Sequence, residues 1–282
     1  MKILSFKKNN KNSFGVLNDN GIVDAGPKLN KKYPNLKSIL ESNKIDLLKK
    51  IENDPIDYRI DDVDFLPPIP NAEKIICVGI NYLGHIKETG REIPKYPVLF
   101  SRFIDSFVGH NEPLVRPRVS SDFDYEGELA VIIGKRAWHV NEASAMEYVA
   151  GYSCCNEGSI RDYQFHTIQW MPGKNFFKSG SIGPYITTTE EQNDPSNFYL
   201  QTKLNGNILQ NAPVSDLCFS IPQLISYCSE WTPLNPGDIL ITGTPGGVGR
   251  VRKPPIWMKP NDEVEVNISG VGILKNTIID EK

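Results

Sequence analysis

The feature that most constrains this chain is an acidic stretch that leads directly into an apolar run. Asp124, Glu126 and Glu128 stand at every second position, and residues 129–134 (LAVIIG) are typical of a buried strand. Because side chains alternate along a strand, we expect the three carboxylates on one face, roughly 6 to 7 Å apart. At an effective dielectric of ~20, neighbouring carboxylates repel by about 2 kcal/mol, so a cation is expected opposite them. The alternative is a solvated acidic strand end.

The donor types in this stretch indicate which cation it would bind. Carboxylate oxygens are hard ligands and no Cys or His cluster stands nearby, which favours Mg²⁺, Mn²⁺ or Ca²⁺ over zinc. The cysteines show no paired C-x-x-C spacing, which indicates buried thiols in a reducing cytoplasm rather than a disulfide scaffold or a zinc site. They are Cys77, Cys154, Cys155, Cys218 and Cys228.

Composition narrows the classes of partner. The 282 residues are 39% hydrophobic, which is enough for a sizeable core, and carry a net charge of -3. The mild acidity and the lack of a basic run argue against nucleic acid or an anionic membrane. No signal peptide follows Met1 and no apolar run is long enough to span a bilayer, so we expect a cytoplasmic protein.

A proline cluster at residues 67–70 (PPIP) is the best candidate for a domain boundary. We therefore predict a small N-terminal domain at residues 1–66, a linker at 67–73 and a catalytic domain at 74–282. Short strands and two helical patterns are expected in the N-terminal domain, with a hairpin turn at Asn20-Gly21. No catalytic motif is recognisable there.

The segment after the acidic strand is expected to bring a third carboxylate to the first two. Residues 141–150 predict one amphipathic helix with an Asn cap. The helix would return the chain to a strand at residues 151–155, and that strand would deliver Glu157 towards Glu126 and Glu128.

Strands dominate beyond residue 70. A hairpin is expected at Asn205-Gly206 and a helix is expected to begin at Ser220. Strands are expected at residues 239–242 and 263–268 and around residues 273–274. This order predicts an α+β fold, a β-rich mixed sandwich or roll, rather than a doubly wound sheet.

Several polar residues are candidates for chemistry, although each alone is more often structural. His85 and Glu88 stand three apart, so on a helical turn they could act as a proton-transfer pair. Arg102 follows a predicted strand and could bind a carboxylate. The remaining candidates are potential donors to a developing oxyanion or another anion: Arg161, Gln164, Lys174 and the glycine-rich loop 243–249, which lacks the ending of a P-loop.

Together these motifs resemble the fumarylacetoacetate hydrolase superfamily, in the branch of bacterial 2-oxo acid hydrolases, hydratases and decarboxylases. The order of five motifs between residue 74 and about residue 276 argues against an accidental match. They are Gly79-x-Asn81-Tyr82-x-x-His85-x-x-Glu88, Asp124-Tyr125-Glu126-x-Glu128-Leu129-Ala130, Arg161-Asp162-x-Gln164, Gly173-Lys174-Asn175-Phe176, and Pro236-Gly237-Asp238 leading to the loop 243–249.

The resemblance implies a β-rich catalytic domain and a divalent cation, usually Mg²⁺, held by Glu126, Glu128 and Glu157. The third ligand in the family is more often Asp, so Glu157 reaches one methylene further and could shift the ion or bind it through water. Other roles are implied at matching positions: Lys174 and Gln164 near the metal, His85 and Glu88 as a lid pair, and Arg161, Thr244, Gly243 and Arg102 as substrate-binding groups.

The resemblance also implies the type of reaction. We expect Mg²⁺-dependent hydrolysis of a carbon–carbon bond in a 2,4-dioxo acid, either acylpyruvate-like or a dioxo sugar acid. Oxaloacetate decarboxylation, hydration of a 2-hydroxydienoate and keto–enol isomerisation use the same metal–enolate chemistry and remain open. A catalytically silent metal-binding protein is a more remote alternative. The expected partners are a small 2-oxo acid and a second copy of the chain in a homodimer.

Overall fold

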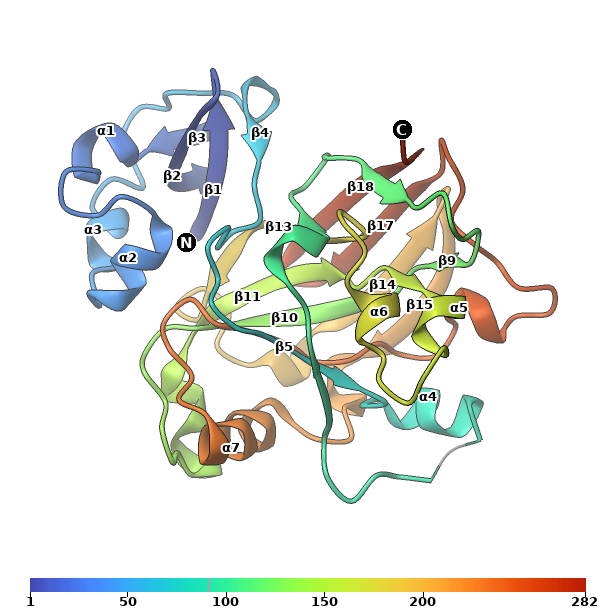
Figure 1. The fold of residues 1–282 in the computed structure, drawn as a ribbon. Coiled ribbons are helices and arrows are strands. Elements are labelled where there is room, and N and C mark those ends of the chain that lie inside the picture. The colour runs from blue at the N-terminus through green and yellow to red at the C-terminus, as the bar shows by residue number, and fades with distance from the viewer. Residues whose placement is uncertain (91) are drawn as a thin grey trace.

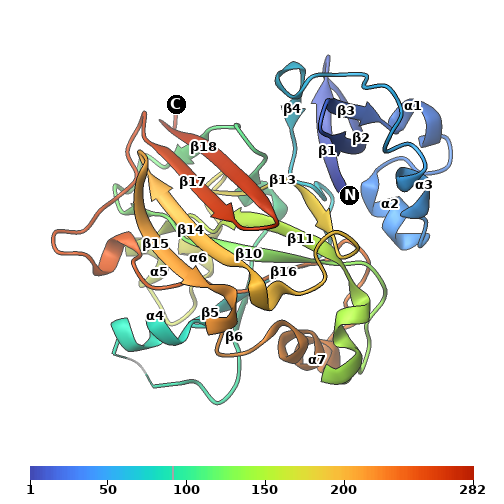
Figure 2. The same ribbon diagram turned by 180° about the vertical axis from the view of Figure 1, so that it is seen from behind.

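Figures 1 and 2 show a β-rich molecule in the computed structural model, which describes residues 1–90 and 92–282. Among these residues, eleven strands form a mixed sheet ordered β3-β2-β1-β13-β11-β10-β16-β5-β6, with β4 paired to β1 and β7 to β13. A five-stranded sheet is ordered β15-β14-β17-β18-β8, and β12 pairs with β9. The strands are β1 (Lys2–Lys8), β2 (Lys11–Asn18), β3 (Gly21–Asp24), β4 (Asp64–Phe65), β5 (Ile75–Gly79), β6 (Val98–Ser101), β7 (Phe107–Val108), β8 (Leu114–Arg116), β9 (Phe123–Asp124), β10 (Gly127–Ile133), β11 (Val149–Asn156), β12 (Ser159–Ile160), β13 (Gly180–Thr188), β14 (Tyr199–Leu204), β15 (Asn207–Pro213), β16 (Ile239–Ile241), β17 (Glu263–Ile268) and β18 (Gly272–Asp280).

The described helices are short. In the part of the chain that the structure describes, none is long and apolar enough to cross a membrane. They are α1 (Gly26–Leu29), α2 (Leu36–Glu41), α3 (Asp46–Lys49), α4 (Leu83–Glu88), α5 (Arg161–Gln164), α6 (Met171–Lys174) and α7 (Ile221–Trp231), with 3₁₀ turns η1 (Ile60–Asp62), η2 (Ile104–Ser106), η3 (Glu142–Tyr148), η4 (Pro195–Asn197), η5 (Val214–Asp216) and η6 (Gly249–Val251).

The two main sheets share a core through β10. Leu129 and Val131 pack in one cluster with Leu200 of β14 and Val266 of β17, whereas Ile132 on the other face belongs to a second cluster. Every residue of β10 is buried, as the continuous apolar run predicted. The α+β fold and the β-rich mixed sandwich are thus confirmed.

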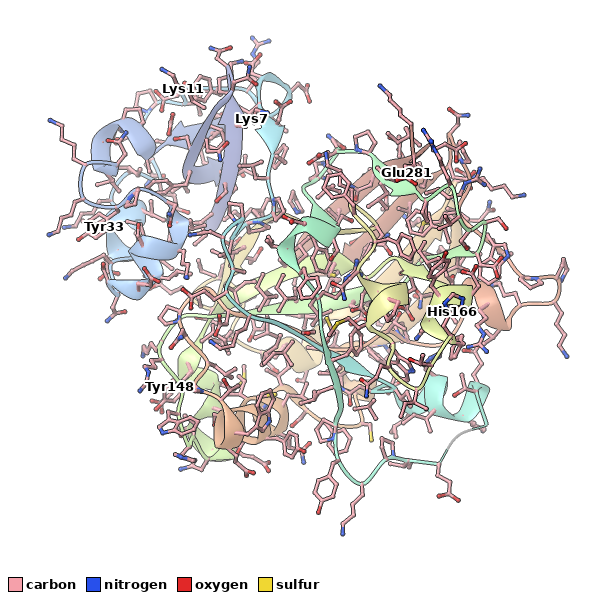
Figure 3. The ribbon with its side chains drawn as sticks, in the orientation of Figure 1. Lys7, Lys11, Tyr33, Tyr148, His166 and Glu281 are labelled. Carbon is pink, nitrogen blue, oxygen red and sulfur yellow. The ribbon has the colours of Figure 1, made fainter. Side chains whose placement is uncertain are left out.

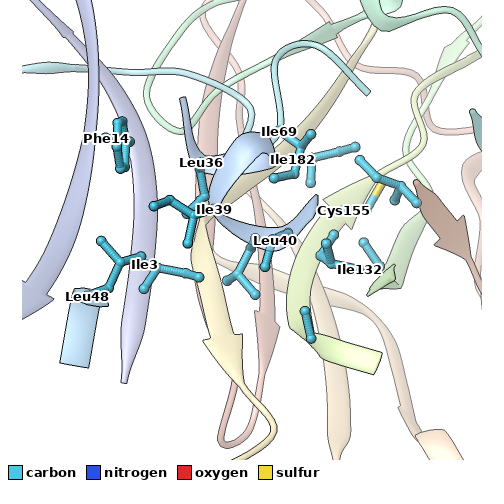
Figure 4. Close-up of a cluster of buried hydrophobic side chains, with 14 of the residues drawn as sticks. Ile3, Phe14, Leu36, Ile39, Leu40, Leu48, Ile69, Ile132, Cys155 and Ile182 are labelled. Atoms are coloured by element: carbon cyan, nitrogen blue, oxygen red, sulfur yellow. The ribbon is translucent and has the colours of Figure 1, made fainter. Parts of the chain in front are cut away.

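The N-terminal strands continue the large sheet. β1 pairs antiparallel with β13, with Ile3 opposite Ile186. Figure 4 shows a hydrophobic cluster in which Ile3 and Leu36 lie together with Ile132 and Ile182. The N-terminal residues therefore share a core with the strands that carry the acidic stretch, while the domain division at residues 67–73 stays a prediction.

Strand pairing sets the position of the acidic residues. β10 and β11 are antiparallel with Gly127 opposite Asn156, so Glu126, just before β10, and Glu157, just after β11, lie side by side. The N–H of Glu157 donates to the carbonyl of Glu126 at 2.7 Å. β16 lies on the other side of β10, which brings the start of the glycine-rich loop next to Glu128.

Three local predictions need correction. Residues 141–150 do not form one amphipathic helix, because η3 is a 3₁₀ helix and Val149 already begins β11. The expected strand through Asp124, Glu126 and Glu128 is broken, since Asp124 pairs with β12 in β9 and Glu126 precedes β10. The first hairpin turn consists of residues 19–20 because Asn18 pairs with Gly21. The Asn205-Gly206 hairpin and the helix after Ser220 are confirmed.

The cap of α7 gives a test of the fold. Ser220 Oγ accepts from the N–H of Gln223 and the Gln223 side chain accepts from the N–H of Ser220, which is a capping box. Ser220→Ala should lower the free energy of unfolding by about 0.5 to 2 kcal/mol in urea denaturation. Ser226→Ala, inside the same helix, is the matched control and should not destabilise the protein, because alanine is the better helix former. Equal effects of the two changes would contradict the capping role.

Candidate functional site

Three buried glutamates meet at one end of the β10–β11 pair. Glu126, Glu128 and Glu157 each offer a carboxylate oxygen, and these oxygens all lie within 4.8 Å of one another. None of the three residues is more than 4% exposed. The structure therefore brings together the three residues that the sequence analysis named as metal ligands.

Two basic side chains and a hydroxyl hold Glu126. Lys174 Nζ donates to Glu126 Oε2 and, at 2.9 Å, to Glu157 Oε2. Arg161 Nη2 donates to Glu126 Oε1 at 2.8 Å, and the Ser159 hydroxyl donates to Oε2 at 2.6 Å. Glu126 therefore has the several donors that a buried ionised carboxylate requires.

Asp124 connects this group to the glycine-rich loop. Its carboxylate accepts from Arg161 Nε at 2.7 Å, from the N–H of Gly249 at 2.7 Å and from the N–H of Arg250 at 3.1 Å. Arg161 also donates from Nη1 to Gln164 Oε1 at 2.8 Å. One guanidinium thus fixes an aspartate, a glutamate and a glutamine relative to one another.

Burial and charge shift the two strand glutamates in opposite directions. Burial would raise the pKa of Glu126, but the charges of Arg161 and Lys174 outweigh it and hold the pKa well below its ordinary value. Burial together with the charges of Glu157 and Glu126 raises the pKa of Glu128 well above its ordinary value. Glu128 therefore holds its proton to a higher pH than Glu126 does.

The residues present fit a divalent cation. Among the described residues, Glu157 Oε1 is buried and has no hydrogen-bond partner, although buried carboxylate oxygens are normally paired. Counting Asp124, four carboxyl groups face the two cations Arg161 and Lys174, which leaves a formal excess of two negative charges once Glu128 is ionised. Glu126, Glu128 and Glu157 would hold the ion, and their oxygens suit Mg²⁺, Mn²⁺ or Ca²⁺.

His85 and Glu88 face each other on α4, as their spacing predicted. His85 Nδ1 lies 3.2 Å from Glu88 Oε2, and both oxygens of Glu88 accept from the N–H of Gly247 at 3.1 Å. Because Nδ1 faces a carboxylate, we assign the proton to Nδ1, which leaves Nε2 able to accept one. Burial lowers the pKa of His85, against the opposing charges of Glu126 and Glu88. A neutral imidazole is therefore expected at pH 7.

The three glutamates and His85 line one small cavity of about 60 Å³, whereas Glu88 and Asp124 lie outside its lining. The glutamates form its base, α4 provides one wall, the α5–α6 segment with Phe165 and Trp170 another, and the glycine-rich loop a third. Figure 1 shows α4, α5 and α6 lying close together at one side of the sheets, and Figure 3 places His166 in the α5–α6 segment. The predicted site residues that line the cavity are His85, Glu126, Glu128, Glu157, Arg161, Gln164, Lys174 and Thr244.

Two predicted substrate-binding groups have other partners in the structure. Arg102 is 2% exposed, does not line the cavity, and donates to Ser106, to Ser179 and to the carbonyl of Gly158. The N–H of Gly243 donates to Glu128 Oε2 at 2.6 Å. Arg102 therefore holds the backbone next to Glu157, and Gly243 orients Glu128, while their predicted contact with substrate stays a prediction.

Arg161 and Thr244 lie at the cavity, but protein groups already contact their polar atoms. Arg161 donates to three side chains of the site. The Thr244 hydroxyl donates to the carbonyl of Gly127 at 3.0 Å and accepts from Gln210 at 2.8 Å. Their predicted contact with substrate therefore stays a prediction.

Three residues organise the site in ways that the sequence did not predict. Asp124 was predicted only to share a strand face with Glu126 and Glu128, whereas it binds Arg161 and the loop. Ser159 donates to Glu126, and Gln210 links the N–H of Gly127 to Thr244. Each partner lies 33 to 125 residues away in the chain, so no local pattern could reveal it.

Comparison with known proteins agrees with this site. The family described as "Fumarylacetoacetate (FAA) hydrolase C-terminal" matches residues 74–279. The chain belongs to the fumarylacetoacetate hydrolase family. The family match begins just after the proposed linker and includes every residue of the site described above.

Individual relatives carry different activities in their names. Oxaloacetate tautomerase Fahd2a, mitochondrial, from Rattus norvegicus is 39% identical over 218 residues, covering 77% of this chain and 70% of that protein. A putative HpcE protein from Mycobacterium smegmatis superposes with a TM-score of 0.89 at 28% identity over 100% of both chains. Maleylpyruvate hydrolase from Sphingobium sp. SYK-6 has a TM-score of 0.84 at 25% identity, also over 100% of both chains.

The raised pKa of Glu128 makes cation binding depend on pH. Since a cation requires the ionised carboxylate, Mg²⁺ binding should release protons from Glu128 and should tighten as pH rises above the ordinary carboxyl pKa of 4.5. Calorimetry in buffers of different ionisation enthalpy measures both effects. Glu128→Gln should weaken binding by at least roughly tenfold and abolish the proton release, while Glu263→Gln, at the exposed first residue of β17, serves as control. Tight, pH-independent binding by Glu128→Gln would contradict the assignment.

Proposed function

We propose that the protein is a metal-dependent enzyme that interconverts the keto and enol forms of a small 2-oxo acid, with oxaloacetate as the first candidate. The observation that carries the proposal is a neutral histidine and a carboxylate group suited to a divalent cation in one cavity. The tautomerase activity in the name of the rat relative supports the same reaction.

The size of the cavity supports a small substrate. Sites for drug-sized ligands usually measure about 300 to 1,000 Å³, whereas this cavity measures about 60 Å³. Trp170 limits the cavity on one side, where its indole ring packs directly against Gly79. The contact is so close that an added Cβ at Gly79 would lie 2.3 Å from the ring. A four-carbon acid is therefore favoured over a dioxo sugar acid.

The side chains of the cavity supply the proton transfer. Nε2 of His85 would take a proton from C3 of the substrate, the C–H electrons would form the C2–C3 double bond, and the 2-oxo oxygen would become an enolate oxygen that is then protonated. Glu88 orients the imidazole and stabilises it once charged. When bound, a divalent cation would act as a Lewis acid on the substrate oxygens.

Lys174 and Gln164 would favour the developing negative charge. The pKa of Lys174 is raised because Glu126 and Glu157 outweigh the effect of burial, so the ammonium stays charged. Gln164 uses its oxygen to accept from Arg161, so its amide nitrogen is the end left for a substrate. Both groups line the cavity and can donate to an oxyanion.

Hydrolysis of a carbon–carbon bond in a 2,4-dioxo acid is the second candidate. The observation that favours it is the His85–Glu88 pair, which suits deprotonation of water for attack on a distal carbonyl as well as proton removal from carbon. The structural similarity to a maleylpyruvate hydrolase supports it too. Product masses separate the classes: a tautomerase leaves the mass unchanged, a hydrolase adds water, and a decarboxylase loses carbon dioxide.

Two further proposals concern the context of the enzyme. We retain the homodimer that the resemblance implies, because strands at the edges of both sheets are compatible with pairing between copies. We also retain the cytoplasmic location suggested by cysteine usage.

Turnover of oxaloacetate tests the proposed function. The wild type with Mg²⁺ should accelerate the loss of enol absorbance, and EDTA should abolish this. His85→Gln should lower kcat by a factor of roughly 10² to 10⁴, because it removes the general base. His166→Gln changes an exposed histidine outside the cavity and is the matched control. Unchanged activity of His85→Gln, or full activity in EDTA, would refute the proposal.

The pH profile provides an independent check on the base. His85 acts only when neutral and is protonated below its pKa, which burial holds under the ordinary value of 6.5. The acid limb of kcat/KM should therefore have its midpoint below pH 6.5 and should disappear in His85→Gln. An acid limb centred above that value in the wild type would assign the base to another group.

A further inference from the structure

We infer that Ile80, held in a left-handed backbone conformation, is a specificity-determining residue whose side chain limits the size of the group that a 2-oxo acid carries on C3; this inference rests on the proposed function and deepens it. Ile80 lies where the chain passes from β5 into α4 (Figure 1) and lines the cavity together with Val78 and Gly79. It is half-buried, whereas the glutamates are buried, so its side chain lies nearer the opening of the cavity.

The backbone of Ile80 adopts a conformation that is unfavourable for isoleucine. Its φ is 58°, which lies in the left-handed region. A β-branched side chain is crowded there, and the residues that enter this region are usually glycine or asparagine. Among the described residues other than glycine, positive φ occurs at six asparagines and at Ile80, His139 and Lys178, so Ile80 is the β-branched member of this group.

The residues on both sides hold Ile80 in this conformation. Gly79 is the last residue of β5 and is fixed by the pairing of β5 with β6. The Asn81 side chain donates to the carbonyls of Phe219 and Thr242 at 3.1 Å and 2.8 Å, and it accepts from the N–H of Phe219 at 2.8 Å. The backbone therefore cannot relax at Ile80 without breaking these contacts, and backbone conformations held in this way concentrate at functional sites.

Packing in the hydrophobic core does not explain why isoleucine occupies this position. None of the four hydrophobic clusters formed by residues 1–90 and 92–282 includes Ile80. Glycine would adopt the same backbone conformation without steric hindrance. The side chain nevertheless contributes to the lining of the cavity, so we assign its role to the cavity rather than to the core.

Removal of a proton from C3 would place the substrate beside Ile80. The carboxylate and 2-oxo oxygens of the substrate belong at the glutamate group, and C3 must lie within reach of His85 Nε2. His85 belongs to α4, which begins just after Ile80, and both residues line the cavity. A group attached to C3 would therefore approach Ile80, and within a cavity of about 60 Å³ a long group would collide with its side chain.

Two 2-oxo acids that differ only in length test the inference. In 2-oxobutyrate C3 carries a methyl group, in 2-oxohexanoate it carries a propyl group, and deuterium exchange at C3 follows the enolisation of each. In the wild type with Mg²⁺, kcat/KM should be at least roughly tenfold higher for 2-oxobutyrate. Ile80→Ala should lower this ratio at least roughly tenfold, chiefly by raising kcat/KM for 2-oxohexanoate.

Ile80→Gly separates the role of the side chain from that of the backbone. It should accept 2-oxohexanoate as Ile80→Ala does, yet it should have a higher Tm than Ile80→Ala because glycine enters the left-handed region freely. At an ordinary position the order is the reverse, since glycine has more freedom to lose on folding. A lower Tm for Ile80→Gly than for Ile80→Ala would overturn the inference, because the backbone would then not hold the side chain at the cavity.

Ile208→Ala is the matched control, since it makes the same change at an exposed position of β15 that does not line the cavity. It should leave the ratio of the two acids unchanged. Ile80→Val keeps a β-branched side chain and should retain most of the wild-type preference. An unchanged ratio in Ile80→Ala, whether both activities persist or both fall together, would overturn the inference. An equal fall of the ratio in Ile208→Ala would do the same.

Calorimetry separates this inference from the proposed function. The wild type with Mg²⁺ should bind 2-oxobutyrate at least roughly tenfold more tightly than 2-oxohexanoate, and Ile80→Ala should remove the difference. Oxalate, which has no C3, should bind both proteins equally and reports an intact glutamate group. If neither acid is turned over, the proposed reaction fails, yet a size preference lost in Ile80→Ala still supports the inference. Equal wild-type affinities for the two acids would overturn it.

Discussion

The ion pairs around Glu126 are the interactions on which the rest of the site depends. A carboxylate that is 4% exposed stays ionised only because Arg161, Lys174 and Ser159 donate to it. Removing one member would leave a buried charge without its partner, which commonly costs 3 to 5 kcal/mol. The same pairs keep the pKa of Glu126 low, while burial and the neighbouring carboxylates raise the pKa of Glu128, so the two glutamates lose their protons at different pH values.

The glycine-rich loop organises the protein's own carboxylates. Three of its backbone N–H groups each bind an acid from a different part of the site: Gly243 binds Glu128, Gly247 binds Glu88, and Gly249 binds Asp124. Gly243 has φ of 105°, and a Cβ there would lie 2.8 Å from the Cβ of Asn81, so glycine is required at this contact. The loop thereby fixes Glu128, Glu88 and Asp124 relative to one another.

Local patterns predicted what local forces determine. The apolar run of β10, the Asn205-Gly206 hairpin and the cap at Ser220 were recognisable because their causes lie within a few residues. That the three glutamates meet could be predicted only from the expected strand pairing together with the family resemblance. The break before Glu126 and the partners of Arg102 were not predictable, because strands and side chains far away in the sequence decide them. Residues 141–150 were misjudged because a 3₁₀ turn and an amphipathic helix share similar spacing.

Most contacts that build the site join remote parts of the chain. Asp124 and Gly249 are 125 residues apart, and Glu128 and Gly243 are 115 apart. Contacts this far apart in the sequence form only after the chain has paid the entropy cost of closing the long loops between them. A nascent or partly folded chain therefore has no glutamate group to offer, and a cation that binds there recognises only the completed fold. By mass action, that ion would also lower the population of unfolded molecules.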